Sequence, residues 1–312
     1  MTQFEPAYIK SCKNGLIKEK IDKAYKILSN CVLCPRKCKI NRLTGQTGVC
    51  KTGRQARVVT YLPHFGEEAP LIGKKGSGTI FFSYCSLLCN FCQNYHVSHE
   101  GYGEDVSDTE IAEMMIFLQN RGCHNINFVT PSHVVPQILS AVAKAAEKGL
   151  SIPLVYDSSA YDCIETLRLL ENIFDIYMPD FKFWDPKIAK LTCNAQDYPE
   201  KARKSVIEMH RQVGDLLIDK SGLAKRGLMI RHLVMPGGLA GTRQVMRFIA
   251  QKISPDTFIN IMPQYRPCSK AIGIDKLFQH LSQKEYKTAL AEARQEGLRR
   301  IYKPEHVFQD PP

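Results

Sequence analysis

Three closely spaced cysteines are the residues of this chain best suited to carry chemistry. Cys85, Cys89 and Cys92 have CxxxCxxC spacing and follow directly on an apolar, strand-like run at residues 79–83. Iron–sulfur cubanes are held by cysteine thiolates, usually one for each iron. Three cysteines therefore hold three irons and leave the fourth open. Because an open coordination position lets a metal act on a bound molecule, the spacing predicts a reactive cluster.

Two simpler explanations exist for the same spacing. The chain has 12 cysteines, which makes a chance group of structural thiols easier to find. A zinc site would usually show paired CxxC elements and four protein ligands. Phe91 directly before the last cysteine and the repeated strand–helix units that follow favour the cluster.

With these features the segment resembles the signature of the radical S-adenosylmethionine (SAM) enzymes. The resemblance implies a [4Fe–4S] cluster whose open iron is chelated by the amino and carboxylate groups of SAM. It also implies reductive cleavage of SAM to methionine and a 5′-deoxyadenosyl radical.

Polar residues follow the predicted strands, at the end where the active sites of such barrels lie. The resemblance places Phe91 near the adenine and implies cofactor contacts for a further set: Thr130, Asp157, Ser158, Asp180, Arg231 and Gln264. Thr130 stands where most relatives have a glycine-rich turn that meets the SAM amino group. His133, nearby, either faces the substrate or caps the next helix. Arg231 is expected to bind the SAM carboxylate or ribose, since a guanidinium suits an oxygen pair.

Asp157 and Asp180 end neighbouring predicted strands. Two such carboxylates can form a general acid/base pair or a site for a hard cation. The pair resembles that of the glycyl-radical activating enzymes, which implies a monovalent cation, sodium or potassium, held against the SAM carboxylate. The alternative is a surface ion pair between Asp180 and Lys182.

Further stretches resemble the PflX branch, homologues of pyruvate formate-lyase activating enzyme. They are Cys92-Gln93-Asn94, His64 to Pro70, Gly76-Ser77-Gly78 and Cys34-Pro35-Arg36. This resemblance implies hydrogen abstraction from a substrate such as a glycine loop of a partner protein, with a low-potential reductant such as flavodoxin or ferredoxin. Glu67 and Glu68 are either acids on the substrate side or part of a charged surface loop.

A second group of cysteines lies near the N-terminus: Cys31, Cys34, Cys38 and Cys50. Four thiolates are enough for a closed site, and such sites hold structural zinc or an electron-carrying iron–sulfur cluster. The neighbouring Pro35 and Arg36 are typical of ferredoxin-like loops and favour a second cluster. Unmetallated thiols are the remaining alternative.

The elements that must position these residues alternate from residue 79 onward. Strands are predicted at residues 79–83, 125–129, 153–156, 174–178, 228–234 and 258–262. Helices are predicted at 107–121, 132–148, 163–170, 202–212, 242–253 and 283–296. Ser107 and Glu110 have capping-box spacing, and Ser132 is expected to cap the second helix. Alternating strands and helices indicate a parallel sheet with helices outside.

The predicted fold is therefore α/β. Six units match the partial (β/α)6 TIM-like barrel of the radical SAM enzymes, preceded by a small cysteine-rich N-terminal module. The predicted division is residues 1–78 for this module, 79–282 for the barrel, and 283–312 for a C-terminal helix and tail.

Composition limits the cellular setting and the partners. The first 20 residues lack the apolar core of a signal peptide, and no segment is apolar for the length of a membrane helix. We therefore expect a cytoplasmic protein without a membrane partner. Cysteines outside the two groups, Cys268 excepted because it is predicted near the site, are expected to be small buried residues. The net charge of +11 is spread over the chain, so nucleic acid is an unlikely partner.

Two alternative functions follow from the same features. An electron-transfer or metal-binding protein without SAM chemistry would use both cysteine groups, although six strand–helix units exceed what that role needs. A radical SAM enzyme acting on RNA would use the net positive charge.

Overall fold

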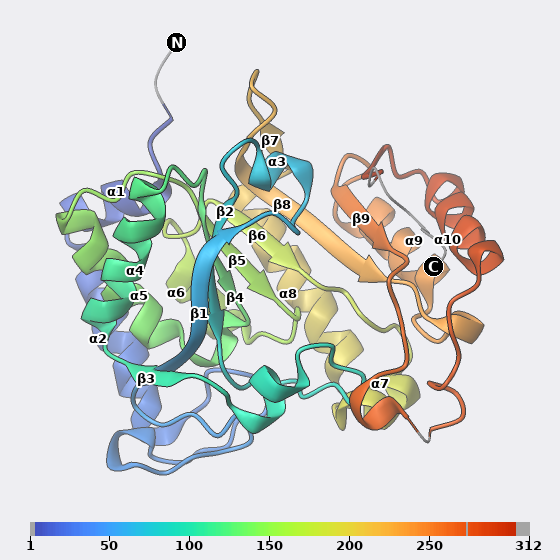
Figure 1. The fold of residues 1–312 in the computed structure, drawn as a ribbon, viewed down its shortest axis with the longest axis horizontal. Coiled ribbons are helices and arrows are strands. Elements are labelled where there is room, and N and C mark those ends of the chain that lie inside the picture. Colours follow the sequence, from blue (N-terminus) through green and yellow to red (C-terminus); the bar gives the residue numbers. More distant parts are fainter. Residues whose placement is uncertain (1–3, 273, 304–312) are drawn as a thin grey trace.

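The computed structural model describes residues 4–272 and 274–303. Its centre is one sheet with the strand order β10-β9-β8-β6-β5-β4-β2-β1-β3, and β7 pairs with β8 outside this path (Figure 1). Neighbours from β2 to β10 are parallel. These strands are β2 (Ser77–Phe82), β4 (Ile126–Val129), β5 (Leu154–Ser158), β6 (Ile176–Pro179), β8 (Ala224–Leu233), β9 (Phe258–Met262) and β10 (Arg300–Ile301).

All six predicted strands are present, and they are neighbours in chain order from β2 to β9. Their residues are mostly buried on both faces, which is why they read as continuous apolar runs in the sequence. The α/β fold class with a parallel sheet is confirmed.

Helices connect the parallel strands: α4 (Asp108–Asn120), α5 (Val135–Glu147), α6 (Ile164–Leu170), α7 (Pro186–Cys193), α8 (Tyr198–Val213) and α9 (Thr242–Lys252). The capping box at the start of α4 is formed, since Ser107 accepts from the Glu110 amide and the Glu110 side chain accepts from the Ser107 amide. The prediction that Ser132 caps the second helix is wrong. Ser132 lies in a short 3-10 turn, and α5 begins only at Val135, where Pro136 suits the first helical turn.

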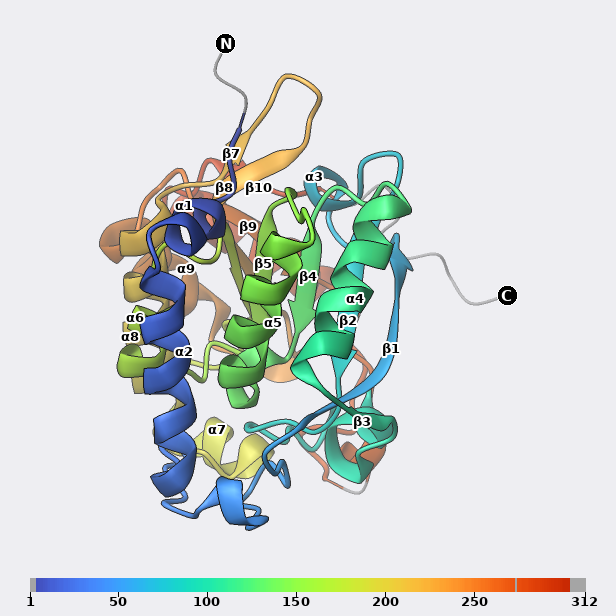
Figure 2. The same cartoon turned by 90° about the vertical axis from the view of Figure 1, so that its left-hand side faces the viewer.

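The N-terminal residues contribute elements that the repeat did not predict. Helices α1 (Ala7–Lys13) and α2 (Leu16–Ile27) pack against α5, on the side away from α4 (Figure 2). Strand β1 (Ala56–His64) pairs antiparallel with β2 and with β3 (Glu104–Val106). Residues before 79 therefore extend the barrel sheet by one strand. The division of the chain at residues 78 and 282 stays a prediction.

Short elements complete the two ends of the sheet. Helix α3 (Ala69–Ile72) follows β1, and β7 (Leu217–Ile218) forms a hairpin with β8. Helix α10 (Gln283–Gln295) packs on α9, and the following β10 adds a parallel strand beside β9. Among the described residues, no helix combines the length and apolar character needed to cross a membrane.

Candidate active site

A cavity of about 800 Å³ opens at the carboxyl ends of the parallel strands and extends into the barrel interior. The three cysteines Cys85, Cys89 and Cys92 line it. So do all the other residues for which the sequence predicted a cofactor contact: Phe91, Thr130, Asp157, Ser158, Asp180, Arg231 and Gln264. The structure therefore brings the whole predicted set to one space, and the role of each member stays a prediction.

The loop that carries the three cysteines is held by backbone conformation and hydrogen bonds. Tyr84 and Leu88 have positive φ angles of 66° and 55°, so the chain turns sharply on either side of Cys85. The amide of Leu87 donates to Cys85 Sγ at 3.3 Å, and Ser98 Oγ donates to Cys92 Sγ at 3.2 Å. Such donors stabilise thiolate sulfur.

In the metal-free protein these thiols are protonated. Burial raises the pKa of Cys85 to about 12. The pKa of Cys89 is raised by a hydrogen bond with Cys193, whose Sγ lies 3.3 Å away, and then by burial. Burial also raises the pKa of Cys92, although the Ser98 hydroxyl opposes the shift. Binding of metal at these residues would release their protons.

The donor set fits an iron–sulfur cluster with one open position. Cys85, Cys89 and Cys92 are the only cysteines among the described residues that line the large cavity. Cys193 and Cys268 lie close by but outside this lining, with Cys268 Sγ donating to the Phe91 carbonyl at 3.1 Å. Three thiols therefore face a space that can hold a further ligand.

Three of the predicted cofactor contacts lie around the rim of the cavity. Phe91 is buried, and its ring packs edge-on against Phe183 and tilted against Tyr265. Thr130 ends β4 in the left-handed conformation, with a φ of 60°, which a glycine would adopt without strain. Gln264 is exposed, and its carbonyl accepts from Gln93 Nε2 at 3.2 Å.

The two strand-end aspartates each have a cationic neighbour within the protein. Asp157 accepts from Arg231 Nη1 at 3.2 Å, and Asp180 accepts from Lys182 Nζ at 2.6 Å. The Asp180–Lys182 pair is largely buried beside Cys89 rather than on the surface. Ser158 donates to Asp162 at 2.8 Å and accepts from the Ala160 amide, so its hydroxyl also holds the loop.

Arg231 is engaged by three carboxylates. Glu68 binds it through both oxygens, at 2.9 and 2.7 Å, and Glu67 and Asp157 add further contacts. Glu68 is buried and also accepts from Asn260 Nδ2 at 2.6 Å. The alternative of a charged surface loop at Glu67 and Glu68 is wrong, because these side chains point inward to Arg231, whose side chain is only 14% exposed.

His64 extends this network to the edge of the cavity. Its Nδ1 lies 3.1 Å from Glu67 Oε1, and this hydrogen bond raises the pKa of His64. Burial opposes ionisation of Glu67, but the hydrogen bond from His64 and the charge of Arg231 hold the pKa of Glu67 at about 2. Glu67 is thus a carboxylate across the physiological range.

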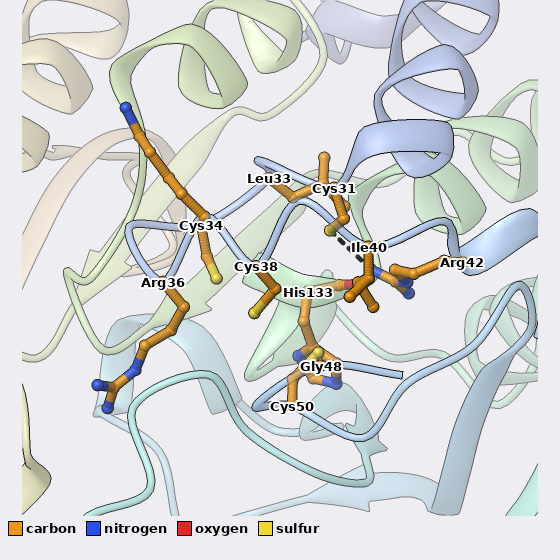
Figure 3. A pocket seen from close by; sticks show the side chains of 11 residues that line it. Cys31, Leu33, Cys34, Arg36, Cys38, Ile40, Arg42, Gly48, Cys50 and His133 are labelled. Carbon is orange, nitrogen blue, oxygen red and sulfur yellow. Dashed lines mark hydrogen bonds between the residues drawn. The ribbon is translucent and has the colours of Figure 1, made fainter. Parts of the chain in front are cut away.

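His133 lies away from the large cavity. It is buried, and its side chain does not cap α5, because no side chain bonds the first amides of that helix. Instead it lines a smaller cavity together with the N-terminal quartet, Cys31, Cys34, Cys38 and Cys50 (Figure 3).

Sequence reasoning missed Cys193 and Asn260, and it considered Lys182 only as a surface partner of Asp180. Cys193, treated as a small buried residue, contacts Cys89. Lys182 and Asn260 line the cavity as partners of Asp180 and Glu68. Lys182 follows the end of a predicted strand, so its position carried a usable signal, whereas Asn260 lies inside the strand predicted at residues 258–262. Cys193 had none, because it ends a helix far from the cluster loop in sequence.

A match to a family model agrees with this geometry. A family model described as the radical SAM superfamily matches residues 79–219. An uncharacterized protein of Methanocaldococcus jannaschii is 29% identical over 297 residues, covering 93% of this chain and 82% of that protein. A crystal structure of HydG, a maturase of the [FeFe]-hydrogenase, is 16% identical with a TM-score of 0.48. That match covers 70% of this chain and 49% of HydG, so it corresponds to about half of the HydG chain. The segment that matches the radical SAM superfamily model includes the cysteine loop and the strand-end aspartates.

Proposed function

We propose that this protein is a radical SAM enzyme that abstracts hydrogen from a glycine in a loop of a partner protein, as an activating enzyme does. The observation that carries the proposal is the large cavity, where the three cysteines and the charged strand-end residues share one space. At about 800 Å³ it lies in the upper part of the usual range for ligand sites, roughly 300–1,000 Å³. Such a space can take a cofactor and an extended peptide segment together.

The mouth of the cavity supports a peptide substrate. Exposed side chains there include Gln93, Asn94 and Gln264. Amide side chains both donate and accept hydrogen bonds, so they suit the backbone groups of an extended chain.

In this proposal Cys85, Cys89 and Cys92 hold a [4Fe–4S] cluster, and the cavity binds SAM. When bound, the two groups supply reductive cleavage of SAM to a 5′-deoxyadenosyl radical. Phe91 and Tyr265, whose rings contact each other, add aromatic surface to the lining of this space. Asp157, Asp180 and Thr130 orient polar groups of the cofactor at the strand ends.

For Arg231 we propose a role other than the predicted contact with SAM. Because Glu67, Glu68 and Asp157 already surround its guanidinium, we assign it to holding these carboxylates in place. A direct contact with the SAM carboxylate would require Arg231 to exchange one of these partners.

The proposal has further parts that rest on the sequence. They are membership of the PflX branch, a cytoplasmic location, and a low-potential reductant such as flavodoxin or ferredoxin. The proposal also includes a monovalent cation between Asp157 and Asp180. It further includes a metal at the N-terminal quartet, either an iron–sulfur cluster or zinc.

Isotope transfer tests the proposed reaction. Anaerobically reconstituted protein with SAM and dithionite should form 5′-deoxyadenosine. When an extract from cells grown on Cα-deuterated glycine is added, deuterium should appear in the 5′-deoxyadenosine. An extract from cells grown on deuterated alanine should give unlabelled product. Product formation without deuterium from glycine would retain the SAM chemistry and reject the glycine substrate. Absence of 5′-deoxyadenosine altogether would reject the enzyme assignment.

A further inference from the structure

The N-terminal quartet surrounds a hollow of its own. Cys31, Cys34, Cys38 and Cys50 all line it, and Figure 3 shows their sulfurs arranged around a common space. Gly48 forms part of the wall, where a Cβ atom would come within 2.7 Å of Cys38 Sγ. A side chain at residue 48 would therefore collide with the sulfur of Cys38, and glycine at this position keeps the hollow open.

The spacing of the sulfurs favours a cluster over a single ion. Four sulfurs that share one zinc ion lie ~2.3 Å from it, whereas nonbonded heavy atoms stay roughly 3.5 Å apart. Four sulfurs around one zinc ion would therefore lie close to van der Waals contact with one another. Within residues 4–272 and 274–303, no three Cys, His, Asp or Glu side chains are arranged to hold one metal ion. Cys85, Cys89 and Cys92 share that property, as expected for ligands of separate irons.

Two buried polar atoms around the hollow have no partner. Arg42 is 1% exposed; its Nε donates to the Gly53 carbonyl and its Nη1 to the His133 carbonyl, but its Nη2 bonds nothing. Its Nη1 also lies 3.9 Å from Cys31 Sγ. A buried charge without an anionic partner is costly. A thiolate-bound cluster provides both negative charge and sulfur acceptors.

His133 is the second of these groups. It is 1% exposed, and its Nε2 lies 2.9 Å from the Ser83 carbonyl, an acceptor, so Nε2 carries the proton. Nδ1 then has a free lone pair and no partner. A histidine that donates one ring N–H to a backbone carbonyl and leaves the other nitrogen open has the arrangement found beside bound metals.

The same hollow is bonded to the loop of the first cluster. Arg36, between Cys34 and Cys38, donates to the carbonyls of Ser86 and Leu87 at 2.9 and 3.0 Å. It also donates to the carbonyls of Cys193 and Asn194, both at 2.7 Å. Because Ser86 and Leu87 lie between Cys85 and Cys89, one side chain connects the two cysteine groups.

We infer that the quartet, with Arg42 and His133 around it, holds a second iron–sulfur cluster. This cluster fixes the position of Arg36, and Arg36 in turn holds the loop that carries Cys85, Cys89 and Cys92. The inference deepens the metal site of the proposed function and does not depend on the substrate. Cluster binding would order the turn from Cys34 to Cys38, since both ends become ligands, and Arg36 is displayed from that turn.

Metal content tests the second cluster independently of SAM chemistry. The Cys85→Ala/Cys89→Ala/Cys92→Ala variant should keep about four irons and four sulfides per chain after anaerobic reconstitution. Adding Cys34→Ala to it should remove them, whereas adding Cys12→Ser, a thiol outside both groups, should not. Stoichiometric zinc that survives reconstitution, or no metal at all in the triple variant, would overturn the inference. Circular dichroism melting shows whether each variant is folded. The Arg42→Gln variant keeps all four cysteine ligands, but a chelator should remove iron from its quartet several-fold faster than from the quartet of the parent.

Amide hydrogen exchange tests the connection between the two sites. In the reconstituted protein, Arg36→Gln should increase exchange at residues 85–92 by several-fold, while both clusters remain by iron analysis. The neighbouring exposed Lys37→Gln is the matched control and should leave the exchange unchanged. Equal exchange in Arg36→Gln and in the parent would overturn the role of Arg36.

Discussion

At the scale of single residues, the site is built from thiols and charges that protein neighbours already compensate. Cys89 lies next to Cys193 and near the Lys182 ammonium, which opposes the rise in the Cys89 pKa. Lys182 is in turn paired with Asp180. The cluster ligands therefore lie beside a partly buried ion pair, so a change in one charge alters the environment of a thiolate.

Cys89→Ala should abolish formation of 5′-deoxyadenosine, because two cysteines cannot hold the cubane in a form that binds SAM. Iron content should fall by about four per chain relative to the parent. Product analysis by chromatography and colorimetric iron measurement check both effects. Cys123→Ala, which removes a buried thiol outside the site, should retain full activity, and product formation by Cys89→Ala would reject the cluster assignment.

Asp180→Ala should weaken SAM binding about tenfold, equivalent to about 1.4 kcal/mol, with iron content unchanged. The carboxylate is proposed to act through a monovalent cation, so binding by the parent should also differ between potassium, sodium and a large organic cation. Calorimetry of the reconstituted protein measures both. If the parent responds equally to all three salts, Asp180 acts only as the partner of Lys182.

At the scale of elements, the segment between β1 and α3 crosses the open side of the barrel. Glu67 and Glu68 lie on this segment, while their partners Arg231 and Asn260 lie on β8 and β9. Strand β1 itself is at the other side of the parallel strands, next to β2. The carboxylates therefore connect the two sides that a closed barrel would join by hydrogen bonds between strands.

Glu68→Ala should destabilise the fold by about 3–5 kcal/mol, because it leaves part of a buried guanidinium without its bidentate partner. Urea unfolding monitored by circular dichroism measures the change. Glu200→Ala, which removes an exposed i,i+4 pair with Lys204, is the matched control and should not change the unfolding midpoint detectably. A Glu68→Ala midpoint equal to that of the control would show that the segment does not hold the barrel together.

At the scale of the whole molecule, the large cavity is lined from almost every layer of the fold. Residues of β1, β2, β4, β5, β8 and β9 border the same space, as do Asp180 directly after β6 and Tyr302 directly after β10. A ligand bound there contacts strands that are distant in the sheet. Its binding free energy is therefore added to the stability of the entire fold.

SAM at about 100 times its dissociation constant should stabilise the reconstituted protein by about 2.7 kcal/mol. For a chain of this size that corresponds to a rise in melting temperature on the order of 5 °C. Anaerobic differential scanning fluorimetry measures it. Reconstituted Cys89→Ala should show a smaller rise or none, and an equal rise in both proteins would place SAM away from the cluster.

Local patterns in the sequence determined the order of the elements and predicted the reaction class. The cluster cysteines lie within eight residues, and the six predicted strands are short apolar runs with helices between them. Because the carboxyl ends of parallel strands meet at one edge, the residues after each strand could be assigned to a common site before any contact was known. Strand β1 was not predicted from the sequence, because it lies at the edge of the parallel strands and much of its second half is exposed.

Only the tertiary structure decided which charges and thiols meet. Glu68 and Arg231 are 163 residues apart in the chain, and Cys89 and Cys193 are 104 apart. Arg36 reaches carbonyls from two distant segments, and the free nitrogens of Arg42 and His133 are recognisable only once their other partners are known. The periodicity of apolar residues indicates which face of an element packs on the core. It does not indicate which side chain of another element contacts that face. That pairing depends on how the whole sheet closes around the cavity.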